Sequence, residues 1–419
     1  MTRRTARLTT LGATVTGAML WPIASSAQIQ AAPGQTFAAP ARSITISVSN
    51  DLLYDTNVAR GSDDAAALRG VKKEDVRTTA SADVDLVLPS GGATFTLAGA
   101  IGYTAYARNE RLDRERIDLT GGADLPVAFC RLAPRARFAR WQTALEDLSI
   151  DLPAARSTEN VQTTASGEAA LSCGPEIGLR SAAFISYADT KNSALTRRAQ
   201  NVQTLGYGAG LSYANPSVGL ITLFAARRDF TYDSRQDAGL PLPLEFSVTR
   251  AGVKVDRRLG TRLQLVASIS HADTRLPAGI RAGRDLDGVN WSLAATLRIG
   301  ERLLFVLESE RAIDSSIGYF ANFVRTSSYG GSLTYALSPF VHVGATLSRR
   351  ARAFQVDAAQ PAFALTADTI DEAAVRLDYA RRRIRLRLNA SYQRRDADRD
   401  LYDYEAALLS ASVSYFLKN

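Results

Sequence analysis

Arginines at every second position are the feature of this sequence with the clearest chemical consequence. Residues 383–392 read RIRLRLNASY, so that Arg383, Arg385 and Arg387 alternate with aliphatic residues. Because successive side chains of a β-strand point to opposite faces, one face of this segment is cationic and the other is apolar. Closely spaced fixed cations attract anions when they face water. We therefore expect this strand to line an aqueous passage with positive charge.

Further basic residues fall on the same phase of their own segments, and we predict that together they line a pore. The predicted pore-lining basic residues are Arg250, Lys254, Arg298, Arg350, Arg352, Arg376, Arg383, Arg385 and Arg387. Several acidic residues, such as Asp256 and Asp378, share this inward phase. The alternative is therefore that the arginines form ion pairs along the wall, and the sequence leaves both interpretations open.

The sequence is poor in residues that could support catalysis or bind a metal. His271 and His342 are its only histidines, and Cys130 and Cys173 are its only cysteines. We find no G-x-S-x-G, H-E-x-x-H or phosphate-binding loop motif. We expect neither an enzyme nor a metal or other cofactor, and no nucleic-acid partner.

The two cysteines occupy consecutive predicted turns. Cys130 would begin one strand and Cys173 would end the next, so the pair would lie at one rim on neighbouring strands. A disulfide between them is feasible in the oxidising periplasm, where its role would be structural. The alternative is two unpaired thiols.

The alternation by twos continues through most of the 419 residues and predicts an all-β protein. Beyond the first thirty residues or so, no uninterrupted apolar run approaches the roughly 18 residues of a membrane-spanning helix. Short and long connections alternate, and the short ones recur roughly every forty residues, as in outer-membrane barrels. The eight short-turn candidates are 89–92, 128–133, 173–176, 214–217, 258–261, 300–302, 338–339 and 381–382. We therefore predict a transmembrane, antiparallel, up-and-down β-barrel of about 18 strands with both termini in the periplasm.

The predicted lipid-facing positions are consistent from strand to strand. In 205–213, for example, Leu205, Tyr207 and Leu211 alternate with inward glycines, whose small size favours an open bore. A soluble β-sandwich or propeller is the alternative, because such folds also alternate by twos.

The N-terminus predicts export from the cytoplasm. Three arginines precede a largely apolar stretch at 8–23, and small residues follow at 25–27, as in a signal peptide. We expect residues 1–27 to be a Sec-type signal peptide, 28–42 a flexible periplasmic segment, and 43–419 a barrel in the lipid of the Gram-negative outer membrane. An uncleaved membrane anchor is the alternative for the first segment.

Residues 50–60, NDLLYDTNVAR, resemble an early motif of the putative outer-membrane β-barrel family that includes EpsL-like exopolysaccharide operon proteins. In that family a first strand runs into an Asp-x-Asn-Val segment, which corresponds here to Asp55, Thr56, Asn57 and Val58. The resemblance implies export of exopolysaccharide or capsular polysaccharide, with a periplasmic polysaccharide-export protein as partner. It supplies no catalytic residues.

These observations lead to one main functional hypothesis and two rivals. The main one is a passive conduit for secreted polysaccharide, with a basic, water-filled lumen suited to anionic polymers. The first rival is a general or anion-selective diffusion porin for small solutes, in which a long loop folds inward, and 55–75 is the longest candidate loop. The second rival is a structural or adhesive barrel with a closed lumen, which Arg–Asp pairs across the bore would favour.

Overall fold

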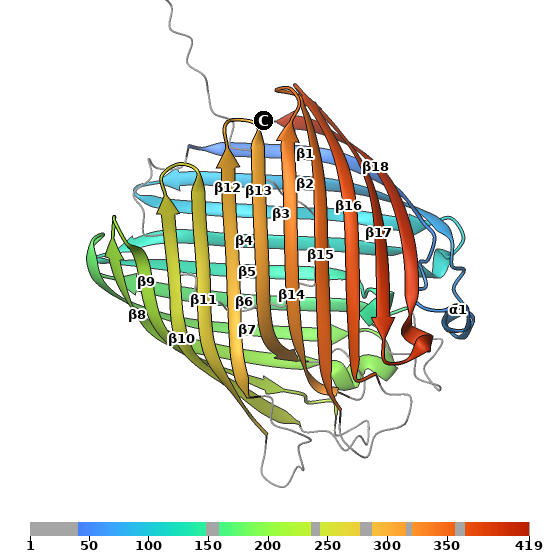
Figure 1. Ribbon diagram of the computed structural model, residues 1–419, viewed down its shortest axis with the longest axis horizontal. Coiled ribbons are helices and arrows are strands. Elements are labelled where there is room, and N and C mark those ends of the chain that lie inside the picture. The colour runs from blue at the N-terminus through green and yellow to red at the C-terminus, as the bar shows by residue number, and fades with distance from the viewer. Residues whose placement is uncertain are drawn as a thin grey trace, which may run out of the picture.

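Eighteen antiparallel strands form one closed sheet within residues 41–147, 159–235, 244–276, 287–315, 321–356 and 365–418, which the computed structural model describes. Each strand pairs with its sequence neighbours, and β1 pairs with β18 to close the barrel (Figure 1). The strands are β1 (Ser43–Asp55), β2 (Asp75–Ser90), β3 (Ala93–Tyr106), β4 (Arg114–Val127), β5 (Cys130–Gln142), β6 (Val161–Cys173), β7 (Gly178–Asn192), β8 (Val202–Asn215), β9 (Gly219–Thr231), β10 (Glu245–Leu259), β11 (Leu263–Arg275), β12 (Gly288–Ile299), β13 (Leu303–Ser315), β14 (Ala321–Ala336), β15 (Val341–Val356), β16 (Ala367–Arg381), β17 (Ile384–Ala397) and β18 (Tyr404–Lys418). The predicted barrel and its strand number are confirmed. The proposed signal peptide and nearly all of the segment that follows it lie outside the described residues.

The eight short turns between the described strands all lie at one end of the barrel, and all eight coincide with predicted turns. Turn chemistry explains the tightest of them. Gly91 and Gly92 join β2 to β3 with φ angles of 58° and 85°, a conformation that two-residue hairpins favour and that glycine adopts without strain. Because β1 begins and β18 ends at this same end, the short turns also mark the end where the sheet starts and finishes. That this end is periplasmic stays a prediction.

The longer connections lie at the opposite end and carry the helical turns. The first of them, residues 56–74 or loop 1, contains helix α1 (Asp63–Arg69). Ser62 caps this helix by accepting a hydrogen bond from the Ala65 amide, and Gly70 ends it with φ 58°. Short 3-10 turns follow in later connections: η1 (Glu110–Leu112), η2 (Leu145–Asp147), η3 (Leu195–Gln200) and η4 (Asp400–Tyr402). No helix among the described residues is long and apolar enough to cross a membrane.

The two faces of the sheet differ as the sequence predicts. On β8, Leu205, Tyr207 and Leu211 are exposed on the outside, and Gly206 between them is buried against the inner side. Large apolar side chains are likewise exposed on the outside of most other strands. An apolar outer face on a closed barrel is stable in lipid and unstable in water. This architecture defines a transmembrane β-barrel of the outer-membrane type.

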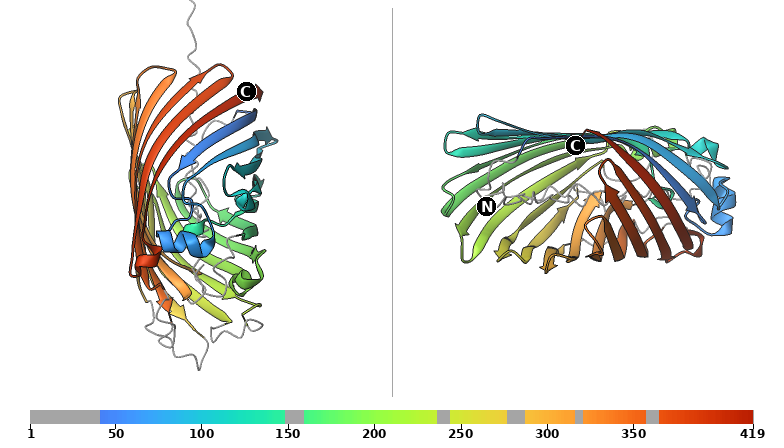
Figure 2. Two further views of the ribbon diagram at one scale, coloured as in Figure 1. Left: turned by 90° about the vertical axis from the view of Figure 1, so that its right-hand side faces the viewer. Right: turned by 90° about the horizontal axis from the view of Figure 1, so that it is seen from above.

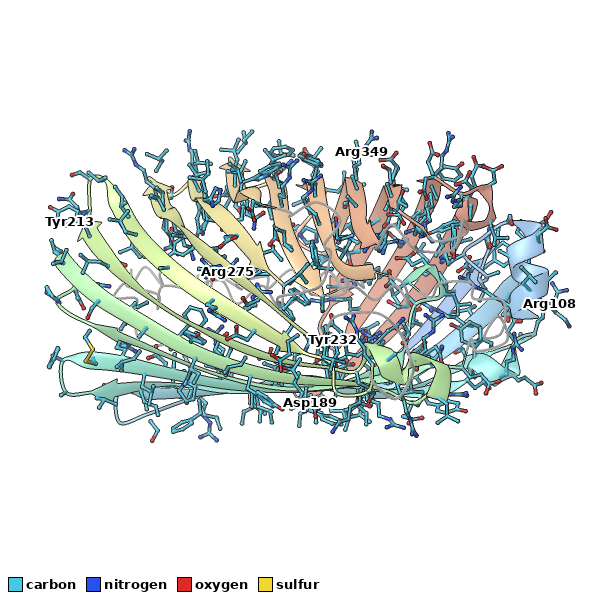
Figure 3. All side chains as sticks on the ribbon, turned by 90° about the horizontal axis from the view of Figure 1, so that it is seen from below. Arg108, Asp189, Tyr213, Tyr232, Arg275 and Arg349 are labelled. Carbon is cyan, nitrogen blue, oxygen red and sulfur yellow. A yellow bond between two sulfur atoms is a disulfide. The ribbon has the colours of Figure 1, made fainter. Side chains whose placement is uncertain are left out.

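The barrel is flattened, so two broad walls face each other (Figure 2). Inside the barrel, at the long-loop ends of β8 to β14, aromatic and aliphatic side chains form a buried cluster: Val202, Phe230, Tyr232, Phe246, Val248, Ala272, Ile313 and Phe323. Phe230 and Phe246 stack with ring centroids 4.4 Å apart. Tyr232 points to the interior of the barrel (Figure 3). This part of the lumen is filled by side chains.

Candidate functional site

The connection between β5 and β6, residues 143–160 or loop 3, reaches the opposite wall of the barrel. Its residues 143–147 and 159–160 are described, and its turn η2 carries Glu146 and Asp147. Glu146 Oε1 lies 2.7 Å from an Nη atom of Arg350, and Asp147 Oδ1 lies 2.7 Å from an Nη atom of Arg352. Both arginines belong to β15, which is eight strands from β5 in one direction around the ring and ten in the other. The described start of loop 3, up to Asp147, therefore lies across the lumen from β5.

A dense set of charged hydrogen bonds holds η2 at that wall. The Tyr404 hydroxyl donates to Glu146 Oε2 at 2.9 Å, and Arg395 donates to the Glu146 carbonyl oxygen at 3.0 Å. Asp368 accepts from both Arg352 and Arg395, with contacts of 2.6 to 2.8 Å. We call these residues the loop 3 anchor: Glu146, Asp147, Arg350, Arg352, Asp368, Arg395 and Tyr404. Charge-assisted bonds of this length are strong, so the anchor fixes the position of η2.

The anchor is almost removed from water, and this determines its electrostatics. The side chains of its two η2–β15 ion pairs are between 5 % and 16 % exposed. Burial alone would raise the pKa of Glu146, but the positive charges of Arg350, Arg60 and Arg352 outweigh it and lower the pKa to about 2. Glu146 is therefore ionised at any physiological pH. Because three carboxylates meet three guanidinium groups in the anchor, it adds no net charge to the passage.

Loop 1 supports η2 from the mouth of the barrel. Its residues Val58, Ala59, Ala66 and Val71 form a buried apolar cluster with Leu145 of η2 and Leu112 of η1. Asn57 ties loop 1 to the wall by donating to the carbonyl oxygen of Glu405 at 3.2 Å. In Figure 2, α1 lies at the long-loop end of the barrel.

The sequence offered residues 55–75 as the longest candidate for an inward loop, and the structure adds loop 3 as the connection that pairs with the opposite wall. In the described chain, the ion pairs to the opposite wall come from Glu146 and Asp147 of loop 3, and loop 1 packs behind them. The motif residue Asn57 has a structural role, because its side chain joins Gly61 within the loop to Glu405 on β18.

The predicted pore-lining residues on the strands fall into four groups. Arg350 and Arg352 belong to the anchor, and Arg250 and Lys254 lie on the inward phase of β10. Near the short turns, Asp378 pairs with both Arg376 (2.8 Å) and Arg387 (2.7 Å), which leaves a local excess of positive charge. Wall pairing, the alternative interpretation, therefore accounts for part of the set.

Arg385 and Arg298 form the fourth group, on the inward phase near the short turns. The guanidinium of Arg385 lies over the Phe416 ring, 5.5 Å from its centroid. Within the described chain neither arginine makes an ion pair with a carboxylate. Among the predicted pore-lining arginines on described strands, these two side chains carry the least compensated positive charge.

Arg383 is the exception, and its assignment to the lumen wall is wrong. Strand β16 ends at Arg381 and β17 begins at Ile384, so Arg383 lies in the exposed two-residue turn between them. The sequence alternation continues through the turn, but the backbone reverses there, with Arg382 at φ 53°. A residue in this turn does not belong to either face of the sheet.

The two halves of the lumen differ in how much space they leave. Near the long loops, two groups of ion-paired side chains occupy the lumen. One is the loop 3 anchor, and the other is the Arg228–Asp314 pair, whose atoms are 2.6 Å apart. Toward the short turns, inward residues such as Ala294, Arg298 and Glu308 are exposed. The lumen is therefore open to water near the short turns and narrowed near the long loops.

Cys130 and Cys173 form a disulfide that joins β5 to β6 at the short-turn end. The two residues oppose each other in the register of these strands. The bond lies at the end of the barrel away from the anchor. It fixes the strands that carry loop 3, and it takes no part in the passage.

The sequence matches no family model and no curated protein. The resemblance to EpsL-like proteins thus gains no support. Among solved structures, the barrel is similar to OccK2 (OpdF) of Pseudomonas aeruginosa, with 17% identity over 90% of this chain and 98% of that one and a TM-score of 0.47. It is also similar to a BenF-like porin of Pseudomonas fluorescens Pf-5 (14% identity, 90% and 99% coverage, TM-score 0.48) and to OpdK of P. aeruginosa (12%, 89% and 99%, 0.45). The likeness concerns the fold alone.

Proposed function

We propose that this protein is a passive outer-membrane channel for small solutes in which loop 3 forms the constriction. The observation that carries the proposal is the pairing of Glu146 and Asp147 with Arg350 and Arg352 on the opposite wall. A loop fixed across a bore limits the cross-section that a solute must pass. Such a passage suits small molecules and obstructs a polymer chain.

The main hypothesis from the sequence, polysaccharide export, has no support in the structure. A secreted polymer needs a continuous wide bore, whereas the anchor and the buried aromatic cluster both occupy lumen near the long loops. The porin alternative fits these observations better, and we adopt it.

We extend the proposal to the charge of the solute. Arg385 and the Arg376–Asp378–Arg387 group place excess positive charge on one wall near the short turns. An anion entering the wider half of the lumen meets this charge before it reaches the constriction. Small anions are therefore the solutes that we expect to pass most readily.

The test is transport by the full mature chain in two formats. In liposome-swelling assays, neutral sugars of increasing size should permeate up to the size of a disaccharide, and dextrans should be excluded. In planar bilayers under a salt gradient, the reversal potential should show anion preference. Permeation by dextrans would overturn the small-solute assignment, and cation preference would overturn the anion assignment.

A second candidate is a structural barrel with a closed lumen. The Arg228–Asp314 pair favours it, because it links β9 to β13 near the long loops, where the aromatic cluster also fills part of the lumen. The bilayer experiment separates the two candidates. A folded protein that inserts and carries no current would support the closed barrel.

A further inference from the structure

The outer face of the barrel carries a groove of about 630 Å³ over strands β13 to β17. Its floor is formed by small outward residues, Ser309, Gly331 and Ala373, and its sides by Tyr329 and Leu347 with further apolar groups. Tyr329 is 43% exposed and Leu347 is 67% exposed, so both face the surroundings of the barrel. A Cβ added at Gly331 would meet no atom within 4 Å, which shows that the space above the floor is free.

The groove lies where the apolar belt of the barrel meets charged residues. On β15 the outward positions run Val343, Ala345 and Leu347 and then reach Arg349. Asp371 on β16 and Arg394 on β17 occupy the neighbouring outward positions in register with it. Figure 3 shows Arg349 projecting away from the wall on the outside. Because the charged residues lie on the long-loop side of the apolar ones, this boundary corresponds to the headgroup level of one leaflet.

The charges at the boundary are available to a ligand. Arg349 Nε is 3.7 Å from Asp371, and both side chains are more than half exposed. Within the lining of the groove, the outward guanidinium groups of Arg349 and Arg394 flank the carboxylate of Asp371, and Glu405 of β18 lies beyond Arg394, in register with it. The groove therefore offers two guanidinium groups beside an apolar floor. A water-soluble ligand would leave the floor unused, and a neutral acyl chain would leave the arginines unused.

We propose that this groove binds a phosphorylated lipid of the surrounding leaflet. An acyl chain would lie over Gly331 and Ala373 against the Tyr329 and Leu347 side chains. The phosphate would accept charge-assisted hydrogen bonds from Arg349 and Arg394, as guanidinium groups favour. The site lies on the outside of the wall, so the proposal is independent of what passes through the lumen.

Native mass spectrometry of the full mature chain in detergent tests the proposal. The probes are diphosphoryl lipid A, phosphatidylglycerol and unphosphorylated diacylglycerol, each titrated separately. We expect one tightly bound phosphorylated lipid per barrel and no comparable binding of diacylglycerol. Whether lipid A or phosphatidylglycerol binds more tightly identifies the leaflet that supplies the ligand.

Two kinds of variant locate the site. Gly331→Leu places a side chain in the groove, and its Cβ would meet no atom within 4 Å. Arg349→Ser with Arg394→Ser removes the phosphate contacts. Each change should weaken binding about tenfold or more, as expected for loss of the acyl pocket or of charged hydrogen bonds. Gly167→Leu is the matched control for the floor, because Gly167 faces outward on β6 and also has no atom within 4 Å of an added Cβ. Arg227→Ser is the control for the rim, because Arg227 is an exposed outward arginine paired with Asp229 on β9.

Heat-modifiable migration on gels verifies that each variant is folded before binding is compared. Unchanged binding in both groove variants would overturn the proposal. Equal binding of diacylglycerol would also overturn it, since the phosphate would then have no role. A dimer of the wild-type protein that Gly331→Leu abolishes, with no bound lipid, would assign the groove to a second copy of the chain instead.

Discussion

Arg350 and Glu146 are 204 residues apart in the sequence, and their side chains meet at 2.7 Å on the inner face of the barrel. This single contact joins a connection between two strands of one broad wall to the middle of a strand in the other. Because of this contact, η2 lies inside the lumen and not at the surface.

Replacing Glu146 with alanine should release η2 from β15. The change leaves Arg350 buried without its carboxylate, and breaking a buried pair in this way costs about 3 to 5 kcal/mol. We expect single-channel current in planar bilayers to rise and to become noisier as the loop moves. Glu159→Gln is the matched control, since Glu159 lies at the other end of the same loop in an exposed pair with Arg114. Identical current in both variants and the wild type would mean that the anchor does not limit conductance.

The conductance should be insensitive to mild acid. The pKa of Glu146 is lowered from its ordinary value of 4.5 to about 2, so the folded state favours the ionised form. The stabilisation from this group is fully present above about pH 4.5 and is lost only as the pH falls toward about 2. We therefore expect constant conductance from pH 7 to about 4, measured in planar bilayers, and a rise only at lower pH. A transition between pH 5 and 6 that Glu146→Gln leaves in place would assign acid sensitivity to another group.

Ion selectivity should depend on Arg385 and not on Arg383. Arg385 faces the lumen without a carboxylate partner in the described chain, whereas Arg383 lies in a turn. We expect Arg385→Ser to lower the anion-to-cation permeability ratio by about twofold, since it removes one fixed charge from the passage. Reversal potentials under a salt gradient measure this ratio. Arg383→Ser is the natural control, and an equal effect of both changes would contradict the wall assignment.

Loss of the disulfide should lower stability and leave transport unchanged. Cys130 and Cys173 are 43 residues apart, and a cross-link over such a segment contributes about 4 kcal/mol in the chain-entropy model. We expect the Cys130→Ala/Cys173→Ala variant to unfold at lower denaturant concentration, as followed by heat-modifiable migration on gels. Its conductance should equal that of the wild type, because the bond lies away from the anchor. A changed conductance would show that the short-turn end contributes to the constriction.

The strands and turns could be predicted because they depend on local signals. The Gly91–Gly92 turn, the glycines of β8 and the outward Leu205 and Tyr207 follow from turn chemistry and from the period of two. The period of two also led to the wrong assignment of Arg383 to the lumen wall, because periodicity does not reveal where a strand ends.

The anchor could not be predicted from the sequence. Glu146 and Asp147 appear as an ordinary acidic pair in a polar connection, and nothing local distinguishes them from Asp63 and Asp64 in loop 1. Their partners lie on β15 to β18, and which loop meets that wall is decided by the closure and flattening of the whole barrel. Loop 1 could be picked out by its length, and it packs behind η2, where Arg60 contributes to the charge around Glu146.

The anchor also bears on the order in which the molecule is assembled. Glu146 takes its partners from positions up to 258 residues further along the chain, so these contacts are among the most non-local in the protein. Contacts of this kind form late in folding. Bringing together residues so far apart in the chain costs conformational entropy, and the contacts offset that cost only after they have formed. A chain that has not yet incorporated β15 to β18 therefore lacks the charged contacts that hold η2 at that wall, and only its packing against loop 1 and η1 remains.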